Sequence, residues 1–133
     1  MSPVRWLPAL LLVLLVLPGC TAAPPAGDGR GDGGVIAPTP ERVERALRFA
    51  ALAPLPAGAQ VVRLEAQSGI DTRVELIVRL AAEQTAPWLA GSGLPVDVQQ
   101  RVANPDGAVV YREARRVDAG PGLADVTVTA FTT

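Results

Sequence analysis

The chain contains no histidine and no lysine, and Cys20 is the only cysteine among its 133 residues. The lack of histidine removes the commonest general base and the usual zinc ligand. The lack of lysine removes Schiff-base chemistry and Ser-Lys dyads. A single cysteine can form neither an intramolecular disulfide nor a cysteine metal cluster. Because only carboxylate chemistry is left, the sequence predicts a protein that is not an enzyme and uses no cofactor or metal.

Charge and length narrow the choice of partners and of domain number. The 12 basic residues, all of them arginine, nearly balance 13 acidic residues, which gives a net charge of −1. Nucleic-acid recognition requires a marked excess of positive charge, so no nucleic-acid partner is expected. The residues that follow Cys20 suffice for one domain and not for two, and a domain of that size can fold without disulfides.

The first twenty residues carry the most specific pattern in the chain. Arg5 precedes an apolar run from Leu7 to Leu17, which is too short to span a bilayer because a spanning helix needs about 20 apolar residues. A basic residue, a short apolar core and a small residue before a cleavage point are typical of an export signal. The stretch ends in Leu17-Pro18-Gly19-Cys20. This ending resembles the lipobox of bacterial lipoproteins, although Pro18 departs from the small or branched residue usual there.

The resemblance implies that residues 1–19 are a lipoprotein signal peptide and that cleavage leaves Cys20 as the first residue. Its sulfur would then carry a diacylglyceryl group, with palmitate-like chains anchoring the protein in the membrane, at about 0.8 kcal/mol per buried methylene. The expected location is the outer face of the cytoplasmic membrane. More loosely, the chain resembles small lipoproteins of high-GC Gram-positive bacteria. An ordinary signal peptide beside a free thiol, or a buried amphipathic element, is the alternative.

Residues 20–38 are mostly alanine, proline and glycine and offer little to fill a core, so they are expected to form a disordered tether. Arg30-Gly31-Asp32 matches an integrin-recognition tripeptide in letters only, because a glycine-rich linker with sparse charges produces it by chance. Asp28 and Asp32 lack the ligand spacing of a calcium loop. The folded domain is therefore expected to occupy residues 39–133.

Hydrophobic periodicity and turn residues predict the elements of this domain. Thr39 and Pro40 are a typical helix start, and Pro54 ends that helix. Asn104-Pro105-Asp106-Gly107 fits a type I turn between two strands. The expected elements are helix 39–53, strands 62–66 and 74–80, helix 83–90, and strands 96–103, 108–118 and 126–130. Val62, Leu64 and Ala66 are expected to alternate in the first strand, and residues 96–103 could form a loop instead of a strand. This α-β-β-α-β-β-β order predicts an α+β fold, with a single antiparallel sheet of four to five strands and two helices on one face.

Four arginines form the densest positive cluster of the sequence: Arg101, Arg112, Arg115 and Arg116. Arginine forks suit phosphate or carboxylate groups, so a wall polymer, a lipid headgroup or an acidic protein surface is a candidate ligand. Strand alternation opposes this interpretation, because it places Arg115 and Arg116 on opposite faces. Glu113 and Asp118 are also close enough in sequence to neutralise part of the charge. Ordinary surface pairing is therefore the favoured reading.

Other candidate sites have weaker support. Ser68 and Ser92 lie beside glycines, but without histidine or lysine neither has an activating base. Trp88 could line a ligand groove, although a tryptophan beside a leucine on a short helix is more often packed on the sheet. The charged residues of the first hairpin, Arg63, Glu65, Arg73, Glu75 and Arg79, are expected on a solvated face with cross-strand pairs.

Three functions follow from this reading. The first is a non-catalytic module that binds an envelope protein or polymer, held to the membrane by its lipid anchor. The second is a carboxylate-dependent wall hydrolase, for which Glu65, Asp71, Glu75 and Glu83 can be nominated although nothing selects a pair. The third is an inhibitor that presents the hairpin loop 68–72 to a secreted enzyme.

Overall fold

The computed structural model describes residues 33–133. The expected signal peptide, Cys20, the Arg30-Gly31-Asp32 tripeptide and most of the expected tether therefore lie outside the described residues. The elements are β1 (Gly34–Val35), α1 (Pro40–Phe49), β2 (Gln60–Gln67), β3 (Arg73–Ala81), α2 (Ala82–Gly91), β4 (Gln100–Ala103), β5 (Val109–Asp118) and β6 (Leu123–Phe131).

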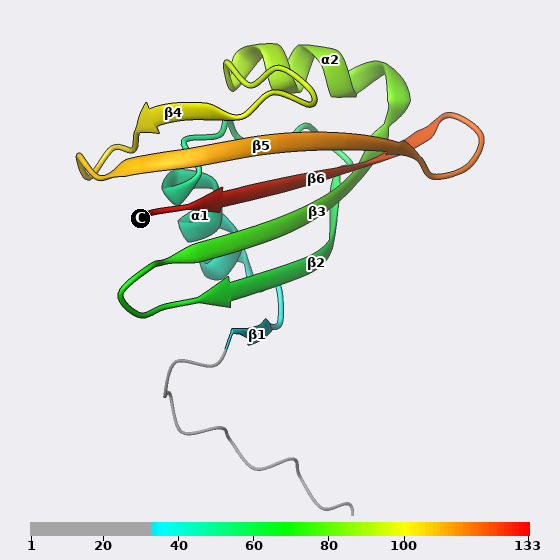
Figure 1. The fold of residues 1–133 in the computed structure, drawn as a ribbon. Helices are drawn as coiled ribbons and strands as arrows, with labels where there is room; N and C mark the ends of the chain where they lie inside the picture. The colour runs from blue at the N-terminus through cyan, green and yellow to red at the C-terminus, as the bar shows by residue number, and fades with distance from the viewer. Residues whose placement is uncertain (1–32) are drawn as a thin grey trace, which may run out of the picture.

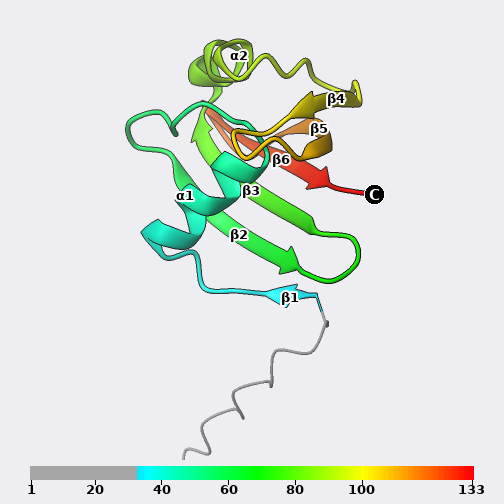
Figure 2. The same ribbon diagram turned by 90° about the vertical axis from the view of Figure 1, so that its left-hand side faces the viewer.

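All strands belong to one sheet in the order β1-β2-β3-β6-β5-β4, and every neighbouring pair is antiparallel. The C-terminal strand β6 lies in the middle, between β3 and β5 (Figure 1). Both helices cover the same face of the sheet (Figure 2). The α+β class and the single antiparallel sheet are thus confirmed. The predicted count of four to five strands is wrong, because the described part of the chain has six, and so is the predicted order, because β1 precedes α1.

Strand β1 lies inside the segment expected to be a disordered tether. Gly34 and Val35 pair with the outer edge of β2, and the Ile36 amide donates to the carbonyl of Leu64 at 2.8 Å. The Ile36 side chain packs against the core. One large apolar residue is sufficient to dock this segment because the edge of β2 supplies the backbone hydrogen bonds.

The hairpin β2–β3 forms as predicted, with a β-bulge between Val61 and Arg63. Val61 faces Val78 and Arg63 faces Ile77, so Val62 has no partner and is 50% exposed. The regular alternation expected for Val62, Leu64 and Ala66 is therefore wrong at Val62. A bulge inserts one residue and shifts the pattern of faces on one side of it, which a count of alternating residues cannot reveal.

The strand expected over residues 96–103 is only half present. Strand β4 covers Gln100–Ala103, and Val96 makes an isolated bridge to Ala114. Asp97 has a positive φ of 60°, and this conformation interrupts an extended strand. The turn at residues 104–107 is confirmed, since the Gly107 amide donates to the Asn104 carbonyl at 2.9 Å.

The core lies between the helices and the covered face of the sheet. It contains the alternate residues of the central strands together with apolar side chains of both helices. Trp88 of α2 is 4% exposed, and its indole nitrogen donates to the Ala53 carbonyl at 3.1 Å. The prediction that Trp88 packs on the sheet is confirmed.

Candidate binding face

The second face of the sheet carries the charged side chains and lies opposite both helices (Figure 2). We call it the open face. The partner registers place charged residues of five strands on it. These residues are Arg63 and Glu65 on β2, Arg73, Glu75 and Arg79 on β3, Asp125 on β6, Glu113 and Arg115 on β5, and Arg101 on β4. The prediction that the charged residues of the first hairpin share one half-exposed or exposed face is confirmed.

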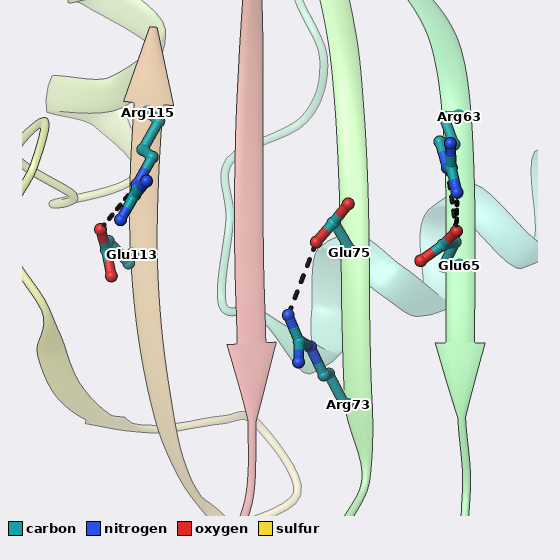
Figure 3. A network of polar contacts seen from close by, with 6 residues as sticks. All are labelled: Arg63, Glu65, Arg73, Glu75, Glu113 and Arg115. Carbon is teal, nitrogen blue, oxygen red and sulfur yellow. Dashed lines mark hydrogen bonds and ion pairs between the residues drawn. The ribbon is translucent and has the colours of Figure 1, made fainter. Parts of the chain in front are cut away.

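A trough of about 740 Å³ runs along β6 on the open face. Its shape follows from side-chain length, because β6 contributes the short residues Thr127 and Thr129, whereas β3 and β5 on either side contribute long ones. Figure 3 shows this arrangement, with a pair of charged residues on each flanking strand and β6 between them. Phe131 also lines the trough and stacks on Tyr111, with 5.6 Å between the ring centroids.

Ion pairs on the open face join residues two apart on the same strand. Arg63 pairs with Glu65 on β2. Arg73 pairs with Glu75 at 3.6 Å on β3, and Arg115 pairs with Glu113 at 3.0 Å on β5 (Figure 3). The expected cross-strand pairs do not form between β2 and β3, where Glu65 lies directly opposite Glu75 in the register. Like charges in facing positions are destabilising, so the same-strand arginines offset that repulsion.

One charged pair does cross between strands. Arg79 on β3 faces Asp125 on β6, with Nε 2.8 Å from Oδ1 and Nη2 2.9 Å from Oδ2. This fork geometry makes the contact directional as well as attractive. The hydrogen bond from Arg79 lowers the pKa of the Asp125 carboxyl group, and the same bond raises the pKa of the Arg79 guanidinium.

The four arginines nominated from the sequence do not share one surface. Arg101 and Arg115 lie on the open face, whereas Arg112 and Arg116 point to the helix-covered face. The predicted separation of Arg115 from Arg116 by alternation is therefore confirmed. Arg116 lies 3.7 Å from Asp118 at the exposed end of β5. Arg112 is 4% exposed and so is not available to a partner at the surface.

The buried guanidinium of Arg112 instead joins the C-terminal ends of both helices. Each helix ends in a Schellman turn whose left-handed residue is Ala51 after α1 and Gly93 after α2. The guanidinium donates to carbonyls at both turns and to one amide: Ala50 O (3.1 Å), Ala51 O (2.6 Å), Ser92 O (2.8 Å), Gly93 O (3.2 Å) and Gln100 Oε1 (3.2 Å). The negative ends of two helix dipoles thus face one cation. Burial lowers the pKa of Arg112.

Sequence reasoning nominated Arg112 for surface binding and did not find this buried role, because the carbonyls come from residues 19 to 62 positions away along the chain. The trough was missed as well. Its signal was present in the sequence, since β6 alternates apolar residues with the short residues Thr127 and Thr129 while both of its neighbours carry glutamate and arginine. Using that signal requires knowing that β6 lies between β3 and β5.

Catalytic and metal-binding arrangements find little support in residues 33–133. The Ser92 hydroxyl accepts a hydrogen bond from the Ala53 amide at 2.9 Å and is buried, so its role there is structural. Glu83 lies in the first turn of α2, away from the other nominated acids. No group of three or more potential metal-ligating side chains is found in this part of the chain. Among the same residues, no helix has the length and apolar character needed to cross a membrane.

Comparison with known proteins finds no similar protein. No protein-family model matches the chain, and no curated protein and no solved structure shows significant similarity to it.

Proposed function

We propose that this chain is a lipid-anchored extracytoplasmic protein whose folded domain is a non-catalytic binding module for an envelope protein or polymer. The anchor rests on the lipobox-like Leu17-Pro18-Gly19-Cys20 and on Cys20 having no other cysteine with which to pair. The described residues begin at Gly33. If residues 20–32 form part of the proposed tether, a flexible linker of about that length would have an end-to-end distance of roughly 18–22 Å, which would hold the domain close to the outer face of the cytoplasmic membrane but clear of it.

The observation that carries the binding role is the trough on the open face. Its floor of Thr127 and Thr129 offers hydroxyl groups, and its walls offer carboxylates and guanidinium groups. A long, open trough of this kind suits an extended partner, such as a polypeptide segment or a polymer strand, better than a small enclosed ligand. Because both signs of charge line it, the partner we expect carries both hydrogen-bond donors and acceptors rather than a uniform negative charge.

The hydrolase alternative fits the same residues less well. Acid catalysis by a carboxyl group requires surroundings that keep it protonated, such as an apolar pocket. Of the acids that line the trough, Glu75 and Glu113 are each paired with an arginine on the same strand, and Asp71 lies in the loop between β2 and β3. Glu65, beside the trough on β2, is paired with an arginine in the same way. This arrangement is suited to presenting charge to a partner, and it supports the binding module over the hydrolase.

One observation favours the inhibitor as a second candidate. Ile70, in the loop between β2 and β3, is fully exposed and packs on nothing. A large apolar side chain at the end of a hairpin is suited to insertion into a substrate pocket of another protein. Replacing Ile70 with aspartate should abolish inhibition of a target enzyme, if the loop has one, while leaving crosslinking at the trough unchanged.

Site-specific crosslinking tests the trough. A photoreactive residue at Thr129 in the trough is compared with one at Arg48, which is exposed on α1 opposite the open face. In cells that produce the protein naturally, we expect a discrete adduct at position 129 and none at position 48. Equal labelling at both positions, or none at Thr129 in intact envelopes, contradicts the binding role of the open face.

Mass spectrometry of the natively produced protein tests the anchor. We expect a mature chain that begins at Cys20 and carries the mass of a diacylglyceryl group, and Cys20→Ser should release the protein from the membrane. An unmodified thiol, or a different first residue, contradicts the lipid anchor. The binding role of the open face is tested separately, by the crosslinking experiment.

A further inference from the structure

A second, smaller hollow lies on the helix-covered side, between α1 and the end of the β2–β3 hairpin. We call it the α1 groove. It measures about 290 Å³. Its lining consists of apolar side chains from three elements and from the segment before α1, with polar residues only at its margin. The apolar residues are Ile36, Ala46, Phe49, Leu64, Ala66 and Val74.

Small residues on both the helix and the sheet line the groove. Ala46 on α1 and Ala66 on β2 both line it, and neither side chain is long enough to fill the gap between helix and sheet. Larger neighbours such as Phe49 and Leu64 are already packed in or against the core. An apolar hollow of this kind gains free energy when an apolar group displaces water from it.

The margin of the groove is positively charged. Arg42 and Arg45 are three residues apart on α1, so their side chains lie on the same side of the helix, and both line the groove. No acidic residue of residues 33–133 lines it. Arg42 also stands in the first turn of α1, where a positive charge is disfavoured by the helix dipole. In the described part of the chain, the Arg42 guanidinium makes one hydrogen bond, to the Ala37 carbonyl at 3.3 Å, which leaves most of the guanidinium donors directed elsewhere.

We infer that the α1 groove binds a free fatty acid, with the hydrocarbon chain on the apolar floor and the carboxylate between Arg42 and Arg45. Charge complementarity fixes the sign of the head group, because the only ionised side chains at the margin are cations. Size fixes the number of chains, since a volume near the lower limit of ordinary ligand sites accommodates one chain and not the two of a membrane phospholipid. The sequence of residues 21–32 offers no large apolar side chain that would suit the groove.

Titration calorimetry on the full chain tests this assignment with three probes of equal chain length. Decanoate carries the negative head, decanol has no charge, and decyltrimethylammonium carries a positive head. We expect saturable binding of decanoate, weaker binding of decanol and none of the cation. Equal affinities for decanoate and decanol, or no heat with decanoate at millimolar concentration, would overturn the inference.

Variants place the site. Replacing both Arg42 and Arg45 with glutamine should weaken decanoate binding by roughly fivefold to tenfold while leaving decanol unchanged. Arg48→Gln is the matched control, because Arg48 lies on the same helix, pairs with Glu44 at 3.4 Å and does not line the groove. Ala66→Leu should fill the groove and reduce binding of both decanoate and decanol. If the double variant, Arg48→Gln and Ala66→Leu all bind decanoate with the same affinity, decanoate binds elsewhere on the protein. That result would refute the proposal.

Discussion

Among the polar side chains, we expect removal of the Arg112 side chain to lower the free energy of unfolding most. Arg112 is 4% exposed and its guanidinium donates to carbonyls at the C-terminal turns of both helices. A hydrogen bond from a charged group contributes about 1.5–3 kcal/mol. If five such bonds were added independently, the total of about 7.5–15 kcal/mol would be as large as the whole stability of a small domain, about 5–15 kcal/mol. The bonds share one guanidinium and are not independent.

A better guide to the magnitude is the cost of breaking a buried charged network by removing one member, about 3–5 kcal/mol. We therefore expect Arg112→Ala to lower the free energy of unfolding by about 3–5 kcal/mol. Arg112→Lys keeps the charge but offers one compact ammonium group, which cannot reach both helix ends. It should recover less than about half of that loss. Arg116→Ala is the control, because Arg116 points to the same face of β5 but is exposed, and its effect should stay within about 0.5 kcal/mol.

Urea unfolding followed by far-ultraviolet circular dichroism measures these differences. Repeating the series in 1 M NaCl separates a buried network from a surface one, because salt screens exposed charges and reaches buried ones much less. The loss for Arg112→Ala should be nearly the same at both salt concentrations. The assignment of Arg112 fails if Arg112→Ala stays within about 1 kcal/mol of the parent chain or if Arg112→Lys is as stable as the parent.

Two further predictions concern backbone conformation and pH. Ala51 and Gly93 hold equivalent left-handed positions, with φ of 51° and 59°, so Ala51→Gly should stabilise the domain by about 0.5 kcal/mol and Gly93→Ala should destabilise it by about 1 kcal/mol. Thermal unfolding of the two variants checks the opposite signs, and equal signs would contradict it. The pKa of Asp125 is lowered in the folded state, first by its hydrogen bond from Arg79, so its contribution is complete above its ordinary pKa and is lost as the pH falls below that value. Asp125→Asn should lower the denaturant midpoint at neutral pH and flatten its decline in acid. A variant as stable as the parent at pH 7 would show that the pair contributes nothing.

Local sequence patterns predicted much of the fold because their physical causes are local. Thr39 accepts a hydrogen bond from the Arg42 amide at the start of α1, as a capping hydroxyl does. The Asn104 side chain accepts bonds from the amides of Asp106 and Ala108, and it closes its turn without help from other elements. Edge strands and β-bulges were harder to predict from the sequence. Strand β1 depends on a partner on β2, and the bulge at Val62 depends on how β2 aligns with β3.

For the candidate site as well, local patterns predicted some features and tertiary packing decided the others. Alternation alone placed Arg115 and Arg116 on opposite faces of β5, and the structure agrees. Alternation could not show that Arg112 meets two helix ends, since those ends come together only when both helices pack on the sheet. The same limit applies to the α1 groove, which is formed by small residues from α1 and β2 that are far apart in sequence.

By itself the sequence determined what depends on neighbours within a few positions: helix starts, turns, the sidedness of regular strands, the chemistry excluded by absent residues and the lipobox-like signal. The tertiary structure decided which strands are neighbours. Insertion of β6 between β3 and β5 creates the trough, and it is a property of topology because short and long side chains form a trough only when their strands are adjacent.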